Sequence, residues 1–353
     1  MKVAFIIPYF GKLPSNFDLW LKTCKANPEF NWLIVGDNKE LPTDLADNVT
    51  YQYFKDMDAL SQLINEKLGL NIRITRPYKL CDYKGLYGAI FSEYLVDYDF
   101  WGYCDMDMFF GKISNYLTPE VLDSYDVIQR WGHLTAIRNN EAGVKLYEKC
   151  FAYSDIETVL NWPMCQGTVE RIMPYVALNE GLRCYYNQAW IADLNFEKFE
   201  FEVVGLKTDN YASQVFTWEN GVTYRYFLNE GRILRDEFMY VHLQKRAIDI
   251  LDNVTGDFVI TPNGLYSKTK EISLADFVTD SQLKVRFDKR FKKMWNRIIM
   301  KRFRDTFFKG KLFIYLTYKR YISKLWASTP DITITKREQG TWEVVSQEAG
   351  LIS

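Results

Sequence analysis

Short runs of β-branched and aromatic residues alternate with helix-like segments over the first 104 residues of this chain. The strand-like runs are Lys2–Ile7, Trp32–Val35 and Phe100–Cys104. The helix-like segments run from Ser15 or Asn16 to about Cys24, from Asp56 to Leu68 and from Tyr83 to Leu95. This alternation predicts an α/β fold in which a mixed, mostly parallel sheet is flanked by helices. Ligands of such folds bind beyond the carboxyl ends of the strands, so we expect a site near Pro8–Gly11, Gly36–Asn38 and Asp105–Asp107.

The charge is distributed very unevenly along the 353 residues. Residues 282–328 contain fifteen Lys or Arg but only two Asp, a net charge of +13, whereas the whole chain carries −1. We therefore expect an acidic folded domain over residues 1–280 and a basic helical arm over residues 281–353. Short strand-like runs after Glu200 predict an extension of the sheet, at Val203–Val204, Val222–Phe227, Arg232–Leu234 and Phe238–His242.

The cysteine and histidine content excludes several kinds of site. The six cysteines are scattered without a CxxC pair, which predicts reduced thiols and neither a zinc site nor a disulfide framework. Only two histidines are present, so metal chemistry would have to rest mainly on carboxylates. No apolar run reaches the roughly 20 residues of a membrane-spanning helix, and the N-terminal run stops at Pro8. We therefore expect a chain that stays in the cytoplasm.

The strand-like run Phe100–Cys104 leads directly into two aspartates, Asp105 and Asp107, that are separated by one residue. Residues i and i+2 of an extended segment point to the same side, so both carboxylates can face one ligand. Two neighbouring anions after an apolar strand repel each other, and a divalent cation would remove that cost. Oxygen ligands suit Mg²⁺ or Mn²⁺, which commonly join protein carboxylates to substrate phosphates. An exposed turn with two solvated aspartates is the alternative.

A second strand-like run, Phe238–Leu243, carries His242 and is followed by Lys245 and Arg246. A neutral imidazole can add a metal ligand without adding negative charge. A single histidine on an apolar strand is otherwise a buried core residue, and both interpretations of His242 remain open. The other histidine, His133, could either line an acceptor pocket or be structural.

Three segments together carry a resemblance to a known class of enzyme. They are Ile6–Gly11, Arg76–Lys84 and Phe100–Gly111, and they resemble the nucleotide-sugar-dependent glycosyltransferases of the GT-A fold, which is Rossmann-like. More narrowly, residues 1–250 are similar to bacterial transferases encoded in capsule and O-antigen loci. The resemblance implies a metal-dependent hexosyltransferase with a nucleotide-sugar donor, expected to be UDP-linked, and with Mn²⁺ or Mg²⁺ as cofactor. The acceptor would be a saccharide or a lipid-linked oligosaccharide in surface polysaccharide synthesis.

The resemblance also implies roles for individual residues. The metal ligands would be Asp107, His242 and, more indirectly, Asp105. The donor would be contacted by residues from several parts of the chain, namely Pro8, Tyr9, Gly11, Asp37, Lys79, Asp82, Lys84, Asp105 and Lys245. A simpler interpretation of the charged residues in Arg76–Lys84 is that they lie at the N-terminus of a helix, with Asp82 as its cap.

Two carboxylates are candidates for the catalytic base. An inverting transferase needs a carboxylate to deprotonate the acceptor hydroxyl. In GT-A relatives this base often lies on a helix shortly before a glycine that opens a strand, and Glu170 stands eleven residues before Gly181. The Glu-Asp or Asp-Glu pair that is usual in those relatives is absent here. Asp193 is therefore a second candidate, and the inverting or retaining outcome stays open.

The basic arm interleaves its cations with aromatic residues at helical spacing, as in Phe287, Phe291 and Trp295. Such an amphipathic helix suits an anionic membrane, and residues 284–326 are expected to bring the enzyme to the inner face of the cytoplasmic membrane. The same composition would fit a nucleic-acid backbone, or helices that pack on the acidic domain with solvated cations. We favour the membrane because a polysaccharide transferase must meet a lipid-linked acceptor, and we expect no nucleic acid.

Two further functions are alternatives to a glycosyltransferase. A sugar-phosphate nucleotidyltransferase or a metal-dependent phosphohydrolase could use the same aspartates, although the first normally needs a glycine-rich loop and Pro8–Lys12 contains one glycine. A nucleic-acid-binding protein would use the basic arm and leave Asp105 and Asp107 without a role.

Overall fold

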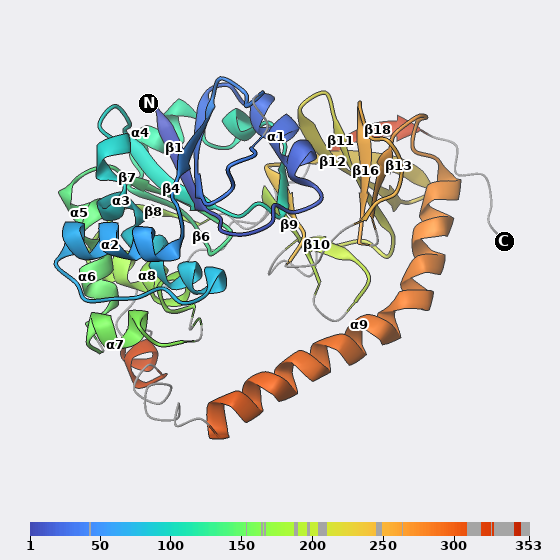
Figure 1. Ribbon diagram of the computed structural model, residues 1–353. Helices are drawn as coiled ribbons and strands as arrows, with labels where there is room; N and C mark the ends of the chain where they lie inside the picture. Colours follow the sequence, from blue (N-terminus) through green and yellow to red (C-terminus); the bar gives the residue numbers. More distant parts are fainter. Residues whose placement is uncertain are drawn as a thin grey trace.

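The computed structural model is a mixed α/β protein built on three sheets (Figure 1). It describes residues 1–41, 44–152, 154–163, 165, 167–186, 190–195, 198–203, 210–244, 249–262, 264–308, 319–325, 327 and 342–346. The first sheet lies at the left of Figure 1 among most of the short helices. The third lies at the right, beside the long helix α9 (Leu274–Phe308), and the second lies between the two.

The first sheet contains the three strands that the sequence predicts. Its order is β3-β2-β1-β4-β7-β6-β8, in which β3, β2, β1 and β4 are parallel and β7 is antiparallel to its neighbours β4 and β6. The strands are β1 (Val3–Pro8), β2 (Phe30–Gly36), β3 (Val49–Tyr53), β4 (Phe100–Cys104), β6 (Val127–Trp131), β7 (Leu134–Arg138) and β8 (Cys184–Tyr185). The α/β class is confirmed, with a sheet of mixed direction whose first half is parallel.

The first two helices also lie where the sequence predicts them. They are α1 (Phe17–Lys25) and α2 (Met57–Leu68). The side chain of Asp56 caps α2 by accepting a hydrogen bond from Ala59 N at 2.9 Å, and Gly69 ends the helix in the left-handed conformation. The other short helices are α4 (Pro119–Ser124), α5 (Glu141–Val144), α6 (Leu146–Cys150), α7 (Ile156–Leu160), α8 (Thr168–Asn179) and the 3₁₀ turn η3 (Ile113–Asn115).

Two hydrophobic clusters cover the two faces of the first sheet. Along β1, Val3, Phe5 and Ile7 pack in one hydrophobic cluster together with α1. Ala4 and Ile6 point to the opposite face and pack in a second cluster, together with α2. Alternate residues of a strand point to opposite faces, so a strand that is apolar throughout must be covered on both sides.

The predicted continuous helix over Tyr83–Leu95 is wrong. The chain forms three short pieces, η1 (Pro77–Leu86, 3₁₀), α3 (Tyr87–Ile90) and η2 (Ser92–Tyr94, 3₁₀). Every residue from 82 to 88 is buried, so the segment has no solvent-facing side of the kind that an amphipathic helix presents. A Cβ on Gly88 would lie 2.4 Å from the Trp101 ring. Close packing against β4 therefore overrides the helical periodicity.

The strands after Glu200 do not extend the first sheet, as the sequence analysis predicts, but belong to two further sheets. The second sheet has the order β10-β9-β14-β5, with β5 (Met108–Phe110), β9 (Ile191–Leu194), β10 (Phe201–Val203) and β14 (Tyr240–His242). The third has the order β15-β17-β16-β11-β12-β13-β18, with β11 (Gln214–Glu219), β12 (Val222–Asn229), β13 (Arg232–Phe238), β15 (Asp249–Ile250), β16 (Phe258–Thr261), β17 (Gly264–Ser267) and β18 (Trp342–Ser346).

Two tight hairpins explain why the third sheet is separate. Asn220 and Gly221 join β11 to β12, and Glu230 and Gly231 join β12 to β13, all four with a positive φ. Two-residue turns of this kind match the twist of antiparallel strands and close a meander, whereas joining the parallel sheet would require a long crossover. The strand β14 leaves this meander and enters the second sheet between β9 and β5.

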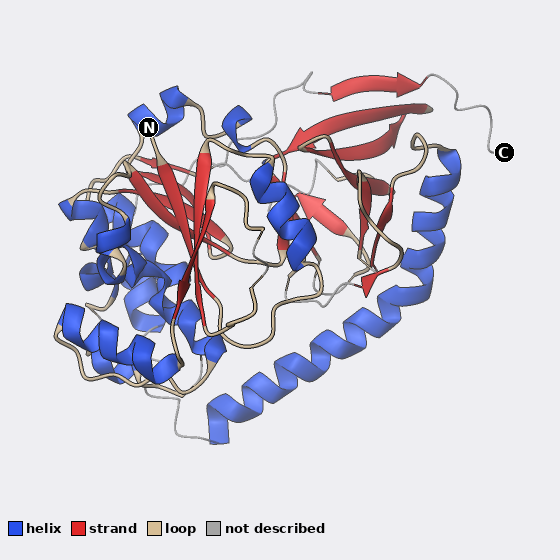
Figure 2. Ribbon diagram, turned by 45° about the horizontal axis from the view of Figure 1, so that its top comes forward, coloured by secondary structure: helices blue, strands red, loops and turns tan. Residues whose placement is uncertain are grey.

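The basic arm begins with α9, which has 35 residues and is about 52 Å long. Figures 1 and 2 show it running along the outside of the molecule from the third sheet toward the side that holds α7. Its first part packs on the body, where Lys284 Nζ lies 3.0 Å from Glu200 Oε2 and Phe287 stacks on Phe199. The sequence-based boundary between residues 280 and 281 falls inside α9, and the division into two domains stays a prediction.

Residues 319–325 form a further helix that contacts the body again. The Tyr321 hydroxyl donates a hydrogen bond to Lys149 O, the penultimate residue of α6, at 2.9 Å. Tyr321, Ile322 and Leu325 pack against the hydrophobic cluster beside α6 and α8. Within the described ranges, no helix has the length and apolar character that crossing a membrane requires.

Candidate functional site

Asp105 and Asp107 lie at the junction of two sheets. The strand β4 of the first sheet ends just before Asp105, and β5 of the second sheet begins just after Asp107. Backbone hydrogen bonds hold this loop from both sides, because Asp105 N donates to His133 O at 3.1 Å and Leu243 N donates to Asp107 O at 2.7 Å. The aspartate loop is thereby tied to the β6–β7 turn and to the end of β14.

The two carboxylates converge on His242. Ligand atoms of Asp105, Asp107 and His242 all lie within 4.8 Å of one another. His242 Nε2 is buried and lies 3.3 Å from Asp107 Oδ1, and among the described residues it has no hydrogen-bond partner of good geometry. Two carboxylates and one imidazole form a set of donors that suits Mg²⁺ or Mn²⁺. These three residues could therefore hold a divalent metal ion.

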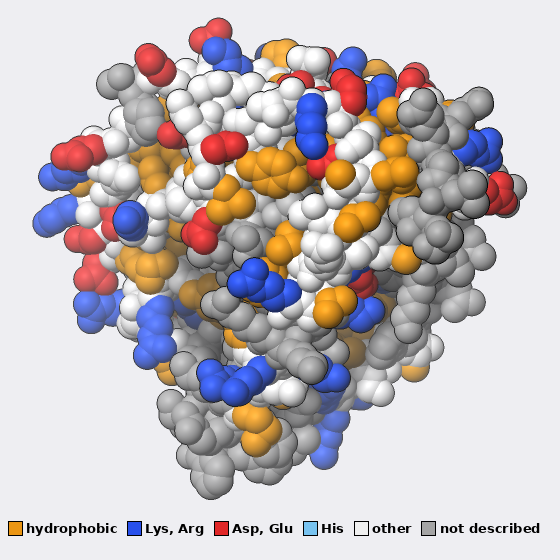
Figure 3. Space-filling model, turned by 90° about the vertical axis from the view of Figure 1, so that its right-hand side faces the viewer, with side chains coloured by type: hydrophobic (Ala, Val, Ile, Leu, Met, Phe, Trp, Pro, Cys, Tyr) orange, Lys and Arg blue, Asp and Glu red, His pale blue; other side chains and the backbone are white. Residues whose placement is uncertain are grey.

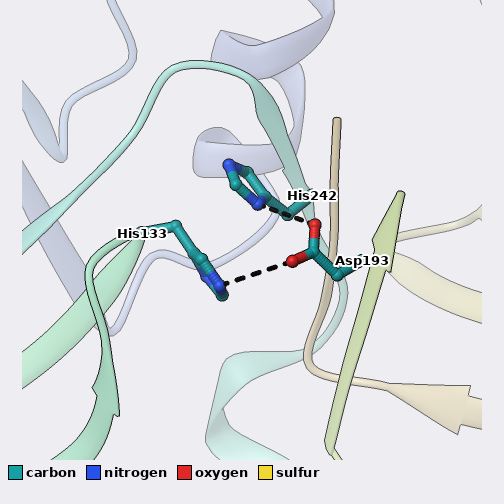
Figure 4. Close-up of side chains that lie close together, drawn as sticks. All are labelled: His133, Asp193 and His242. Atoms are coloured by element: carbon teal, nitrogen blue, oxygen red, sulfur yellow. Dashed lines mark hydrogen bonds and ion pairs between the residues drawn. The ribbon is translucent and has the colours of Figure 1, made fainter. Parts of the chain in front are cut away.

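A second group shares His242 and is more deeply buried (Figure 4). His242 Nδ1 lies 2.9 Å from Asp193 Oδ1, and His133 Nε2 lies 3.9 Å from Asp193 Oδ2. The parallel pairing of β9 with β14 produces this arrangement, because it sets Asp193 opposite His242. The rings of His133 and His242 stack with their centroids 4.2 Å apart, and the Tyr240 hydroxyl lies 2.8 Å from His133 Nδ1.

The surrounding carboxylates determine the protonation of His242. Burial by itself lowers the pKa of a histidine, but the charges of Asp107 and Asp193 raise the pKa of His242 to about 10. Tyr9 lies in the same negative field, and both its burial and the charge of Asp107 raise its pKa. The negative field that favours the charged form of this imidazole would also favour a cation bound among these carboxylates.

Lys84 reaches the same group of side chains from η1. Its Nζ donates to Asp105 Oδ1 at 2.8 Å and to Gly132 O at 2.5 Å, and its side chain is 6% exposed. Lys79 and Asp82, from the same segment, form a buried ion pair at 2.7 Å. The N-cap position of this segment is Arg76, so the interpretation of Asp82 as its cap is wrong. The structure thus brings Lys84 to Asp105.

The ends of β1 and β2 lie together at the same edge of the first sheet. Tyr9 N donates to Val35 O at 2.7 Å, and Gly11 N donates to Asp37 Oδ1 at 2.8 Å. A Cβ on Gly36 would lie 2.3 Å from Tyr9 O, so this close approach of the two strand ends requires glycine. Because β4 pairs with β1 on the other side, this edge continues into the aspartate loop.

Residues 5–269 match the model of a family described as "Family of unknown function (DUF6625)". The chain belongs to this family. Asp105, Asp107, His133, Asp193 and His242 all lie within the DUF6625 region, whereas α9 follows it. Among curated proteins, none matches the chain.

The chain is also similar to two solved glycosyltransferase structures. One is the galactosyltransferase LgtC in complex with donor and acceptor sugar analogues, at 13% sequence identity and a TM-score of 0.28, covering 55% of this chain and 76% of LgtC. The other is the apo form of the glycosyltransferase GlyE from Streptococcus pneumoniae TIGR4, at 13% identity and a TM-score of 0.25, covering 53% of this chain and 46% of GlyE.

Two predicted residues of the DUF6625 region lie outside what the structure describes. Lys245 belongs to a segment outside the described residues. For Glu170 the backbone belongs to α8, but the side chain is outside the described part. Their expected roles, as diphosphate contact and catalytic base, stay predictions.

The sequence analysis predicted His242 beside the two aspartates, but it missed the contact of Tyr240 with His133 and the contacts of His242 and Gln244 with Asp193. Tyr240 and His242 are two residues apart on β14, so they share one face, and the sequence pattern shows this. Gln244 Nε2 donates to Asp193 Oδ2 from just beyond the strand. The partners come from distant parts of the chain. The pairing of β9 with β14 brings Asp193 to His242, and His133 lies in the β6–β7 turn beside Asp105.

Proposed function

We propose that the protein is a metal-dependent glycosyltransferase that moves a sugar from a nucleotide-sugar donor to a saccharide or lipid-linked acceptor. The observation that carries this proposal is the convergence of Asp105, Asp107 and His242 within 4.8 Å, beside the carboxyl ends of parallel strands. Open α/β sheets bind their ligands at such edges. The resemblance of Ile6–Gly11 and Phe100–Gly111 to GT-A glycosyltransferases supports the same chemistry.

The residues fit a divalent metal ion. His242 Nε2 is a buried nitrogen that faces Asp107 and, among the described residues, forms no hydrogen bond of good geometry. Asp107 and His242 would hold Mn²⁺ or Mg²⁺ with a contribution from Asp105, and the bound ion would stabilise the diphosphate of the donor as it departs. Lys84 already neutralises Asp105 across 2.8 Å, so Asp107 is the stronger of the two carboxylate ligands.

Lys84 supplies a fixed positive charge to the same place. Its side chain is buried, and its Nζ is held by Asp105 and Gly132 O, so the ammonium group cannot move freely into solvent. A charge that is already in position costs no rearrangement when a phosphate binds. Lys84 would therefore help to bind the donor diphosphate, together with Lys245 if that residue acts as the sequence predicts.

The edge formed by β1 and β2 would hold the nucleoside. Pro8, Tyr9, Gly11 and Asp37 gather there, and Gly11 N is bound to the Asp37 carboxylate at 2.8 Å. This edge adjoins the aspartate loop, so a nucleotide could place its base here and its diphosphate at Asp107. A UDP-linked donor is our specific proposal for this position.

A thermal-shift panel tests the proposed function. Nucleoside diphosphates and nucleotide sugars are each added with Mn²⁺ or with EDTA, and the unfolding temperature is measured. We expect a UDP-sugar with Mn²⁺ to stabilise the protein by about 2.7 kcal/mol at a concentration of about 100 times Kd, and to have little effect in EDTA. The matched control is the nucleoside monophosphate, which lacks the diphosphate.

Two other results would count against a glycosyltransferase. If no nucleoside diphosphate or nucleotide sugar gives a metal-dependent shift, the proposed donor site does not exist. If the protein releases pyrophosphate from a nucleoside triphosphate and a sugar phosphate, it is a nucleotidyltransferase instead.

We further propose that the basic arm binds an anionic membrane surface, as expected for an enzyme with a lipid-linked acceptor. On α9 the described residues after Phe287 are exposed, including the cations Lys292, Lys293 and Arg297. Large apolar side chains lie among them, with Met300 65% exposed. Figure 3 shows hydrophobic side chains between Lys and Arg on the face it draws, with the basic side chains prominent in its lower part. Residues 309–318 and 326 of the predicted membrane segment lie outside the described residues.

Vesicle sedimentation tests the membrane proposal. The triple variant Lys292→Glu, Lys293→Glu, Arg297→Glu should bind vesicles containing anionic phosphatidylglycerol about 100-fold more weakly, because each basic residue near such a surface contributes about 1 kcal/mol. Reversing the exposed residues Lys25, Lys55 and Lys112 of the body is the control for net charge. Equal loss of binding in both variants, or binding that is unaffected by salt, would contradict a specific role of α9.

A further inference from the structure

Asp193 is the centre of the buried side-chain group. It lies on β9 directly opposite His242 on β14, and its side chain is 10% exposed. Oδ1 accepts from His242 Nδ1 at 2.9 Å, and Oδ2 accepts from the amide of Gln244. Both oxygens are therefore engaged within the protein. A general base would instead need an oxygen that is open to the hydroxyl of an acceptor.

The bond to Asp193 determines which nitrogen of His242 is available. An ionised carboxylate can only accept hydrogen bonds, so His242 Nδ1 must carry the hydrogen. In the neutral imidazole the lone pair then belongs to Nε2, which lies 3.3 Å from Asp107 Oδ1. A histidine whose far nitrogen donates to a carboxylate is the usual arrangement of a metal-binding histidine.

We propose that Asp193 is a positioning residue, which holds His242 so that Nε2 faces the metal site formed with Asp105 and Asp107. This inference rests on the metal-dependent function proposed above. It gives Asp193 a role different from that of the catalytic base, which then falls to another residue. Gln244 assists by holding the second oxygen of Asp193.

The geometry also indicates which of the two groups that share His242 would hold the metal ion. The rings of His133 and His242 stack at an interplanar angle of 26°, with centroids 4.2 Å apart. The lone pairs of an imidazole lie in the plane of its ring, so two stacked rings do not direct their nitrogens to one point between them. A metal on His242 Nδ1 would also break the bond to Asp193. His133 therefore supports the ring of His242, and the metal belongs on the side of Asp107.

Mn²⁺ binding tests this inference without any assay of sugar transfer. Asp193→Asn keeps the shape of the side chain, but its amide group can donate to Nδ1 and move the hydrogen of His242 to Nε2. We expect Asp193→Asn to weaken Mn²⁺ binding by about 10–100-fold in calorimetry. Asp99→Asn, the same change at an exposed aspartate outside both groups, should leave the affinity unchanged.

Electron spin resonance of bound Mn²⁺ provides a second measurement, because a directly bound imidazole adds a nitrogen modulation to the echo signal. The chain has only two histidines, so two variants assign this signal. His242→Gln should abolish the modulation and His133→Gln should keep it, whereas Asp193→Asn should reduce it while the protein remains folded by circular dichroism.

Three results would overturn the inference, and they separate it from the proposed function. If Asp193→Asn binds Mn²⁺ with wild-type affinity and modulation, Asp193 does not position His242. If the wild type binds Mn²⁺ without a nitrogen modulation, His242 is not a ligand, although a metal-dependent enzyme remains. If the wild type binds no Mn²⁺, the proposed function fails and the inference fails with it.

Discussion

Asp107→Asn should lower the rate of sugar transfer by at least about 100-fold, because it removes the carboxylate that faces His242 at 3.3 Å. Asparagine keeps the size of the side chain but loses its charge, so it remains a weak neutral donor to a divalent cation. The affinity for Mn²⁺ should fall together with the rate. The measurement is the initial rate with the donor found in the thermal-shift panel, at several Mn²⁺ concentrations.

The matched control for this change is Asp99→Asn, since Asp99 is exposed and accepts a hydrogen bond from Lys2 N at the opposite end of β4. Its transfer rate should equal that of the wild type. Adding EDTA to the wild type should reproduce the loss seen in Asp107→Asn, and Mn²⁺ should reverse it. Full activity of Asp107→Asn, or of the wild type in EDTA, would refute the assignment of this site.

The second large effect concerns stability and lies in the third sheet. Arg225 and Asp236 face each other on β12 and β13, and both are almost completely buried. Arg225 Nε and Nη2 donate to the two oxygens of Asp236 at 3.0 and 2.6 Å, and Nη1 donates to Gln214 Oε1 at 2.8 Å. The guanidinium carbon also lies 5.1 Å from the centre of the Phe238 ring. The two hydrogen bonds between Arg225 and Asp236 offset the free-energy cost of burying both charges.

Asp236→Asn should lower the free energy of unfolding by about 3–5 kcal/mol, because it leaves the buried charge of Arg225 without its partner. Denaturant unfolding followed by circular dichroism measures the change. The control is Glu141→Gln, which breaks the exposed pair of Glu141 with Lys145 and should cost less than about 1 kcal/mol. If the two variants lost similar amounts of unfolding free energy, burial would not increase the contribution of the Arg225–Asp236 pair to stability.

The local features of the fold could be predicted from the sequence. The positions of the first two helices, the strand Phe100–Cys104 and the alternation along β1 follow from residue types within a few positions of one another. The segment Tyr83–Leu95 could not be predicted in this way. Its conformation depends on the contact of Gly88 with Trp101 on β4, which lies on a different element.

The candidate site was predictable in part. The i, i+2 spacing places Asp105 and Asp107 on one side of an extended segment, and the place of His242 on an apolar strand ahead of Lys245 and Arg246 makes it a candidate third ligand. The sequence did not show that Asp193 and His133 would lie beside His242. These residues are separated by 49 positions or more from His242. The pairing of β14 with β9 brings Asp193 there, and His133 comes from the β6–β7 turn, where its carbonyl oxygen accepts a hydrogen bond from Asp105 N.

The sequence by itself determined the α/β class, the first strands and helices, the paired aspartates and the charge of the arm. These properties depend on the order of apolar, polar and charged residues over short distances, and such patterns can be read along the chain. Only the tertiary structure decided that the later strands build two further sheets, that Lys84 neutralises Asp105, and that Asp193 binds His242. Those outcomes depend on which strands pair across long separations in the sequence. The backbone groups at the edge of a strand form the same hydrogen bonds with any partner strand, so the local sequence does not show which strands will pair.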